Sequence, residues 1–191
     1  MNRILGLMSL IKHLQQVKDF RTKPRYPLWV VLVLVTMGTM SGCNGYRPLA
    51  DFVSRHQSVL LELLGLPNQR LPSWSTIRRV MVRVDFVSLT EAFNAWMQEA
   101  FVPMSNEQIA TDGKSIKASL SDYDSAYQDF VSVVSAFSVA QGVVVGLESM
   151  RNHHTSEIKT VEMLLDKLQL KGVCFSLDAL HTQKNSWANH Q

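Results

Sequence analysis

Two aspartates stand where this chain could carry out metal-dependent chemistry. Asp112 follows the apolar Ile109 and precedes Gly113, the pattern of a strand that carries a carboxylate into a turn. Asp178 ends a second apolar stretch, which we predict to be a buried strand. Carboxylate oxygens are the ligands that Mg²⁺ prefers, and two such ions can hold the attacking and leaving oxygens of a phosphodiester. The alternative at each position is an aspartate that only forms a turn.

Four groups of residues follow one another in the second half of the chain: Asp112-Gly-Lys-Ser-Ile-Lys-Ala-Ser119, Asp129-Phe-Val-Ser-Val-Val-Ser-Ala-Phe137, Asn152-His-His-Thr-Ser-Glu-Ile158 and Leu177-Asp-Ala-Leu-His-Thr-Gln183. This order resembles the DDE-type transposases of bacterial insertion sequences, in the branch of the H-repeat-associated proteins. The first half resembles the helical domain that precedes the catalytic core in that branch, at Tyr26-Pro-Leu-Trp29, Ser41-Gly-Cys43 and Pro72-Ser-Trp-Ser-Thr-Ile-Arg-Arg79. The resemblance therefore covers nearly the whole chain.

The resemblance implies an enzyme that cuts and joins DNA at the ends of its own element. In that mechanism three acidic residues hold two Mg²⁺ ions. Asp112 matches the first acid and Asp178 the second. Lys114 would neutralise phosphate charge, and His181 and Gln183 would lie near the substrate or the metal-bound water. The alternatives are a solvated lysine and a histidine whose hydrogen bonds are satisfied within a loop.

The resemblance fails after the second acid. Thirteen residues follow Asp178, and none has a carboxylate side chain to match the third acid of the family, a glutamate. We therefore expect a truncated transposase that is inactive or nearly so. Glu157 also matches a family motif position, although a glutamate at a helix start can simply favour the helix dipole. The rival hypothesis is a non-enzymatic DNA-binding protein, derived from a transposase, that occupies the element ends and represses the full enzyme.

The elements that must position these residues fall into two parts. Apolar side chains recur at helical spacing before residue 105, and from Ile109 the spacing becomes that of strands. Helices are predicted over 2–18, 28–40, 51–64, 73–84, 87–101 and 157–168. We predict an α+β protein with an all-helical, helix-turn-helix-like domain over 1–105 and an incomplete RNase H-like α/β catalytic domain over 106–191. In an RNase H-like order the first and fourth strands are neighbours, which would bring Asp112 and Asp178 together.

The predicted helix that begins at Ser73, its expected N-cap, has one apolar and one basic side. Its basic side carries Arg78, Arg79 and Arg83. A basic face opposite a core face is what a helix laid against DNA phosphates would show, and the resemblance makes this segment the second helix of a helix-turn-helix. The alternative is an ordinary solvated surface helix.

Charge and composition agree with a DNA partner. Residues 1–105 hold 12 basic and 6 acidic side chains, whereas residues 106–191 hold 7 basic and 10 acidic ones. A basic half suits a polyanion and an acidic half suits a metal, although the same asymmetry arises from chance clustering on solvated faces.

The compartment and the absence of a membrane partner are predicted from the cysteines and from one apolar run. Cys43 and Cys174 lie in apolar segments and are expected to be buried thiols in a reducing cytoplasm. The apolar run from Leu28 to Met40 is shorter than the roughly 20 residues that span a bilayer, so we predict a buried helix and no membrane partner. An exported lipoprotein is a third hypothesis. The oligomeric state is left open, a homo-oligomer included.

Overall fold

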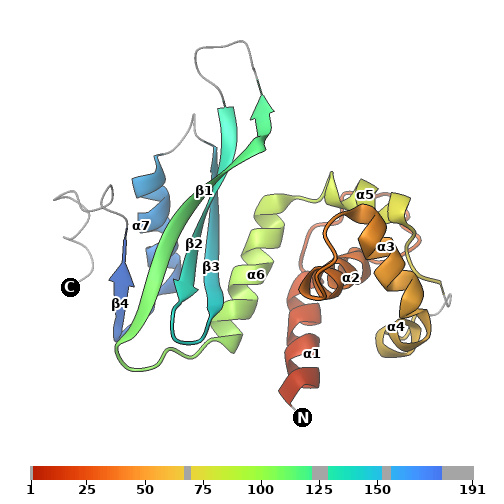
Figure 1. Cartoon of the computed structure of the whole chain (residues 1–191), viewed down its shortest axis with the longest axis horizontal. Coiled ribbons are helices and arrows are strands. Elements are labelled where there is room, and N and C mark those ends of the chain that lie inside the picture. Colours follow the sequence, from red (N-terminus) through yellow and green to blue (C-terminus); the bar gives the residue numbers. More distant parts are fainter. Residues whose placement is uncertain (1, 67–69, 122–128, 152–155, 178–191) are drawn as a thin grey trace. The chain divides into compact units, whose positions relative to one another are not determined.

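The computed structural model describes residues 2–66, 70–121, 129–151 and 156–177. The chain forms two compact units, Met1–Ala92 and Phe93–Gln191 (Figure 1). The first unit is helical and the second combines helices with a sheet, so the predicted α+β class is confirmed. In these described ranges no helix combines the length and the apolar character needed to cross a bilayer. The helices are α1 (Asn2–Leu14), α2 (Leu28–Met40), α3 (Tyr46–Arg55), α4 (Gln57–Leu64), α5 (Trp74–Met81), α6 (Phe86–Ala100) and α7 (Glu157–Leu168).

Helix α2 forms the centre of the helical unit. It contains no charged residue, and Val30, Val31, Val33 and Leu34 are 0% exposed. Residues of α1, α3, α4 and α5 join the same apolar cluster. A helix that is apolar on all sides must be enclosed by other elements, and here those elements are helices. The prediction of a buried helix over this run is confirmed.

One predicted helix of this unit is divided in the structure. The sequence predicts a single helix over 51–64, but α3 ends at Arg55 and α4 begins at Gln57. His56 lies between them with φ −105° and ψ 18°, outside the helical range, and its ring packs against Phe52 at a centroid distance of 4.8 Å. The segment contains no glycine or proline that could signal the break, so the prediction of one continuous helix is wrong.

The second unit contains a four-stranded mixed sheet. Its strands are β1 (Glu107–Ser121), β2 (Asp129–Ser138), β3 (Val143–Arg151) and β4 (Val173–Ser176), in the spatial order β3-β2-β1-β4. β1 and β2 are antiparallel, as are β2 and β3, whereas β1 and β4 are parallel. The α7 helix connects β3 to β4. The predicted order of three strands, a helix and a fourth strand is confirmed, and so is the prediction that the first and fourth strands are neighbours.

Helix α7 covers one face of this sheet. Ser156 caps its start by accepting a hydrogen bond from the backbone N–H of Lys159, at 3.4 Å. Val161, Leu164 and Leu168 of α7 pack in one cluster with Ile109, Val134 and Ala136 of the sheet. Side chains alternate between faces along a strand, so the opposite face of β1 and β2 carries the exposed Ile116 and Phe137.

Two predictions about the last strand are wrong. Cys174 is exposed and the residues of β4 are at most half-buried, although the sequence predicted a buried thiol in a buried strand. β4 pairs with β1 on one side only in the described sheet. Its Cys174 stands opposite Gln108, whose neighbour Ile109 points to the buried face. An apolar run therefore forms an edge strand of the described sheet.

Helix α6 continues from the helical unit into the sheet unit. Its residues Phe93, Trp96 and Met97 join the cluster beneath α7. The Asn94 side chain donates to the backbone carbonyl of Leu147 in β3 and accepts from the N–H of the same residue, both at 2.8 Å. The units divide between Ala92 and Phe93, thirteen residues before the predicted end of the first domain at 105. The division differs because the second half of α6 buries its apolar side in the sheet unit.

Candidate nucleic-acid interface and acidic site

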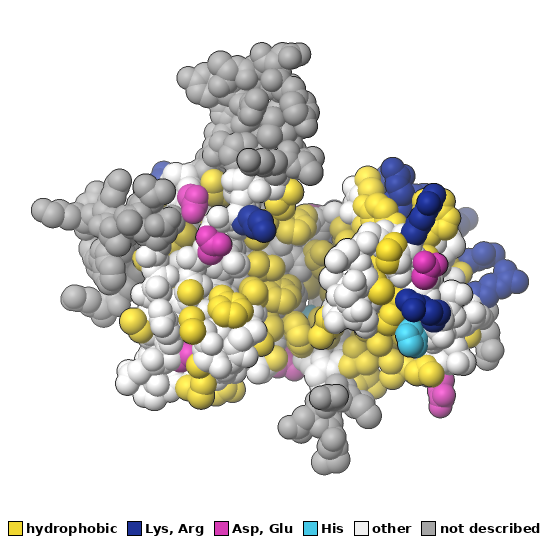
Figure 2. Space-filling model, viewed as in Figure 1, with side chains coloured by type: hydrophobic (Ala, Val, Ile, Leu, Met, Phe, Trp, Pro, Cys, Tyr) yellow, Lys and Arg dark blue, Asp and Glu magenta, His cyan; other side chains and the backbone are white. Residues whose placement is uncertain are grey.

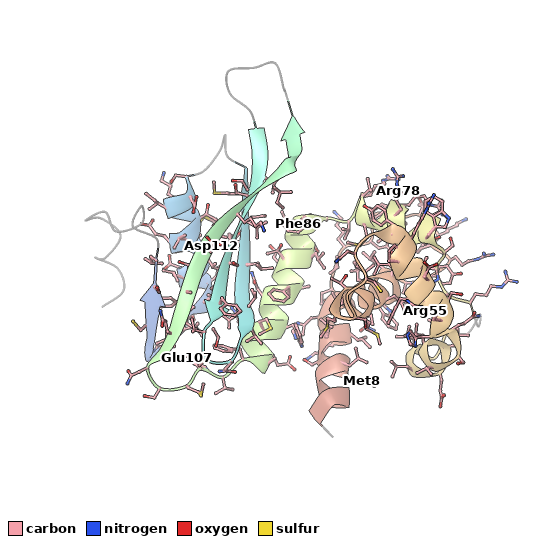
Figure 3. The ribbon with its side chains drawn as sticks, viewed as in Figure 1. Met8, Arg55, Arg78, Phe86, Glu107 and Asp112 are labelled. Carbon is pink, nitrogen blue, oxygen red and sulfur yellow. The ribbon has the colours of Figure 1, made fainter. Side chains whose placement is uncertain are left out.

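The apolar side of helix α5 packs in the core, and its arginines therefore lie on the side that faces solvent. Ile77 and Val80 are 0% and 1% exposed. Arg78, Arg79 and Arg83 are all exposed, on the helix and just after it. Figure 3 labels Arg78 on α5, and in Figure 2 most of the Lys and Arg side chains visible on that face lie over the helical unit. The helix can therefore offer cations without loss of packing.

Ser73 precedes α5 as its N-cap residue, but its side chain makes no capping hydrogen bond to the backbone. Its hydroxyl lies 3.1 Å from the Ser75 hydroxyl and 3.4 Å from that of Thr76. The predicted position of the helix start is confirmed. The hydroxyl groups at this end of the helix form a small polar cluster beside the arginines.

Asp112 lies on the exposed face of β1 (Figure 3). It stands opposite Ser135 of β2, whose hydroxyl donates to the Asp112 backbone carbonyl at 3.5 Å. Lys114 is also exposed, two residues further along the same face and opposite Val133. The structure thus brings the first predicted acid and the predicted phosphate-binding lysine to one surface of the sheet.

The β1–β4 ladder lies just before Asp112. Its last described pair is Ala110 with Ser176, and the Thr111 hydroxyl donates to the Ser176 carbonyl at 3.4 Å. Asp112 therefore lies beside the carboxyl end of β4, where open sheets bind their ligands. β1 itself continues to Ser121, so the predicted turn directly after Asp112 is wrong. The other predicted site residues, Asp178, His181 and Gln183, lie outside the described residues.

Gly113 brings a carboxylate of α7 against β1. A Cβ atom added to Gly113 would lie 2.2 Å from Oε1 of the Glu157 side chain, so a larger residue here would require that side chain to move. Glu157 is half-buried and approaches the face of β1 opposite to the one that carries Asp112. The sequence feature that points to this contact is the match of Glu157 to a family motif position. Its alternative interpretation, a glutamate that favours the helix dipole, does not predict the contact.

Glu107, at the start of β1, is held as an anion by three donors. The Ser138 hydroxyl, the Met104 N–H at 2.8 Å and the Gln141 side-chain amide at 3.1 Å all donate to its carboxylate. These hydrogen bonds, with that of Ser138 the largest cause, lower the pKa of Glu107 below its ordinary value. The carboxylate joins β1, β2 and the segment before β1, so its role is to fix the sheet.

Comparison with known proteins relates the chain to transposases. Residues 11–97 match the family described as DDE_Tnp_1-associated. The chain is 29% identical over 184 residues to the H repeat-associated putative transposase YhhI of Escherichia coli (strain K12), covering 95% of this chain and 47% of the relative. It is 29% identical over 184 residues to the H repeat-associated putative transposase YbfD of the same strain, covering 95% of this chain and 71% of the relative.

A further relative, the putative transposase YncI of Escherichia coli O157:H7, is 28% identical over 183 residues, with 95% of this chain and 46% of the relative covered. This chain spans about half the length of the curated relatives it matches first. No solved structure matches it. The predicted resemblance to transposases of the H-repeat branch is confirmed.

Proposed function

We propose that this chain, a relative of the H-repeat-associated putative transposases, acts on DNA at the ends of an insertion element. The helical unit would bind the DNA through Arg78, Arg79 and Arg83. The sheet unit would be the first part of an RNase H-like domain in which Asp112 and Asp178 hold the metal for strand cleavage and joining. DNA binding and strand cleavage both take place on DNA, so the proposed compartment is the cytoplasm.

The parallel β1–β4 pair is the observation that carries this proposal. Ala110 stands opposite Ser176. This last described pair lies two positions before Asp112 in the sequence of β1 and two positions before Asp178 in the sequence that follows β4. The two aspartates are sixty-six positions apart in the sequence, and the β1–β4 pairing brings together the residues that precede them.

The proposed ion is Mg²⁺, which requires several oxygen ligands. Asp112 suits it in donor type and in exposure. The described ranges contain no group of three or more His, Cys, Asp or Glu side chains that could hold a metal, so Asp112 would depend on Asp178. When bound, the ion would supply Lewis acidity at the phosphodiester. Lys114 would bind a neighbouring phosphate oxygen, and His181 and Gln183 would orient the attacking water.

DNA binding by the helical unit requires no metal, so we expect the chain to bind DNA in the absence of Mg²⁺. The same expectation describes the second candidate function, a non-enzymatic DNA-binding repressor. It is favoured by the exposed arginines of α5, which need no metal to bind phosphates.

The test is an assay with a labelled duplex that carries a terminal inverted repeat, with and without Mg²⁺. We expect salt-dependent binding. Arg78→Gln should weaken this binding and should reduce the slope of log affinity against log salt by about 1. Binding without cleavage supports the DNA-binding role and the expected inactivity. Mg²⁺-dependent cleavage that Asp112→Asn abolishes would contradict the inactivity and support the acidic site. Absence of salt-dependent binding would overturn both functions.

A further inference from the structure

The helical unit contains a cavity of about 630 Å³ whose walls are rich in arginine. One wall is the segment between α1 and α2, which contributes Arg21 and Arg25. The other wall is α5, which contributes Arg79, together with Arg83, which lies two positions after the helix ends. The full lining is Phe20, Arg21, Thr22, Pro24, Arg25, Tyr26, Leu71, Ser73, Thr76, Arg79, Val80 and Arg83.

Four cations line this cavity and no carboxylate does, but one of the cations is already neutralised. Arg21 donates from Nε and Nη2 to the two carboxylate oxygens of Asp19, each at 2.8 Å, and from Nη2 to the Tyr26 carbonyl at 2.9 Å. Arg25, Arg79 and Arg83 pair with no carboxylate in the part of the chain that the structure describes. The cavity thus has an excess of three positive charges.

The walls of the cavity are held in place by the fold. Tyr26 is 8% exposed, and its hydroxyl donates to the Leu71 carbonyl at 3.3 Å. Val80 is 1% exposed and belongs to the apolar core. The Arg83 guanidinium lies 4.9 Å from the centre of the Phe20 ring, a cation–π contact that orients it. Arginines mounted on such a frame can bind an anion with little loss of side-chain freedom.

We propose that this cavity binds one nucleotide unit of DNA, with its phosphate on Arg25 and Arg79 and its sugar and base against the apolar lining. A guanidinium group matches a phosphate with two parallel hydrogen bonds. The volume lies within the range of about 300 to 1,000 Å³ typical of small-ligand pockets and exceeds what a phosphate alone requires. The hydroxyls of Ser73 and Thr76 add polar groups for the sugar. This inference deepens the proposed DNA binding and rests on it for the choice of nucleic acid.

The probe for the cavity itself is thymidine 3′,5′-diphosphate, which contains a base, a sugar and two phosphates. Titration into the full chain, followed by amide NMR shifts and calorimetry, is expected to give saturable binding with shifts at residues 20–26 and 73–83. Arg25→Gln and Arg79→Gln should each weaken binding at least tenfold. Arg55→Gln is the matched control, because Arg55 is exposed on α3 of the same unit and does not line the cavity. Arg25 is itself exposed, so its loss leaves the core intact, which the thermal melting curve checks.

The second arm uses the inverted-repeat duplex with the same variants. Weaker duplex binding by Arg25→Gln than by Arg55→Gln, together with diphosphate binding, supports a DNA nucleotide as the ligand. Diphosphate binding without duplex binding would overturn the DNA assignment and the proposed function, and would leave a site for free nucleotides. Duplex binding without saturable diphosphate binding, or an equal effect of Arg25→Gln and Arg55→Gln on both probes, would overturn the cavity proposal and leave the proposed function standing.

Discussion

Replacement of Asn94 by alanine tests whether the second half of α6 is an integral part of the sheet unit. The Asn94 side chain makes two hydrogen bonds to the backbone of Leu147 on β3, each 2.8 Å long. β3 is an edge strand of the described sheet, so its outer backbone groups have no neighbouring strand. The side-chain amide of Asn94 makes to Leu147 the two hydrogen bonds that a neighbouring strand would otherwise make.

The expected loss of stability follows from these two bonds. A hydrogen bond within a protein contributes about 0.5 to 1.5 kcal/mol net, so the pair is worth about 1 to 3 kcal/mol. Alanine is the better helix former by about 0.5 kcal/mol, which offsets part of the loss. We therefore expect Asn94→Ala to lower the free energy of unfolding of the sheet unit by about 0.5 to 2.5 kcal/mol.

The assay is urea unfolding of the full chain, followed through the amide NMR signals of residues in β2 and β3. These signals report on the sheet unit without a contribution from the helical one. Hydrogen exchange at the Leu147 amide gives a local readout, because loss of its acceptor should speed exchange at that residue. Gln98→Ala is the comparison variant. It removes one exposed hydrogen bond of the same helix, from the Gln98 side chain to the Lys167 carbonyl at 2.9 Å, and should cost about 0.5 kcal/mol.

A result within about 0.5 kcal/mol of the unmodified chain, with unchanged exchange at Leu147, would refute this reasoning. It would mean that α6 is not docked on β3 and that the sheet unit does not begin before residue 105. A fragment that starts at residue 93 should then fold no better than one that starts at residue 106. If the docking is correct, only the longer fragment should show a cooperative transition.

Two further predictions concern the sheet unit. Gly146→Ala should lower its free energy of unfolding by about 1 to 3 kcal/mol, because the new Cβ would lie 2.6 Å from Cδ2 of the buried Leu168. An unchanged urea midpoint of the sheet signals would contradict this packing. The lowered pKa of Glu107 adds stability that is fully present above the ordinary glutamate pKa of about 4.3 and is lost as the pH falls through the lower folded-state value. Glu107→Gln should therefore flatten the acid side of the stability–pH curve relative to the unmodified chain, and an acid limb of unchanged steepness would contradict the role given to the hydrogen bonds from Ser138 and its neighbours.

Local pattern in the sequence was sufficient for most of the elements. An uncharged run predicted α2 and its burial, and helical spacing predicted α5 and α7 close to their observed limits. The change of spacing at Ile109 marked the start of the sheet. These predictions succeed because each depends on residues within one or two turns of each other, whose side chains share a face. The order of the motifs also identified the related transposases before any fold was known.

Local pattern did not predict where one element meets another. An apolar run at β4 indicated burial, but only the sheet order shows that β4 lies at an edge and leaves Cys174 exposed. The apolar side of α6 was visible in the sequence, yet nothing local assigned its second half to the sheet rather than to the helices before it. The close approach of Glu157 to Gly113 depends on the packing of α7 against β1.

The arginine cavity shows the same division between sequence and structure. Composition and spacing were enough to predict that the first half of the chain is basic and that Arg79 and Arg83 face away from the core, Arg79 on α5 and Arg83 just after it. Arg25 lies in a segment that the sequence marked only as a break between two helices. Tertiary structure decided that this segment packs against α5, through the buried Tyr26 and its hydrogen bond to Leu71. Periodicity records which side of an element is buried, whereas the partner that buries it is fixed by contacts between residues far apart in the chain.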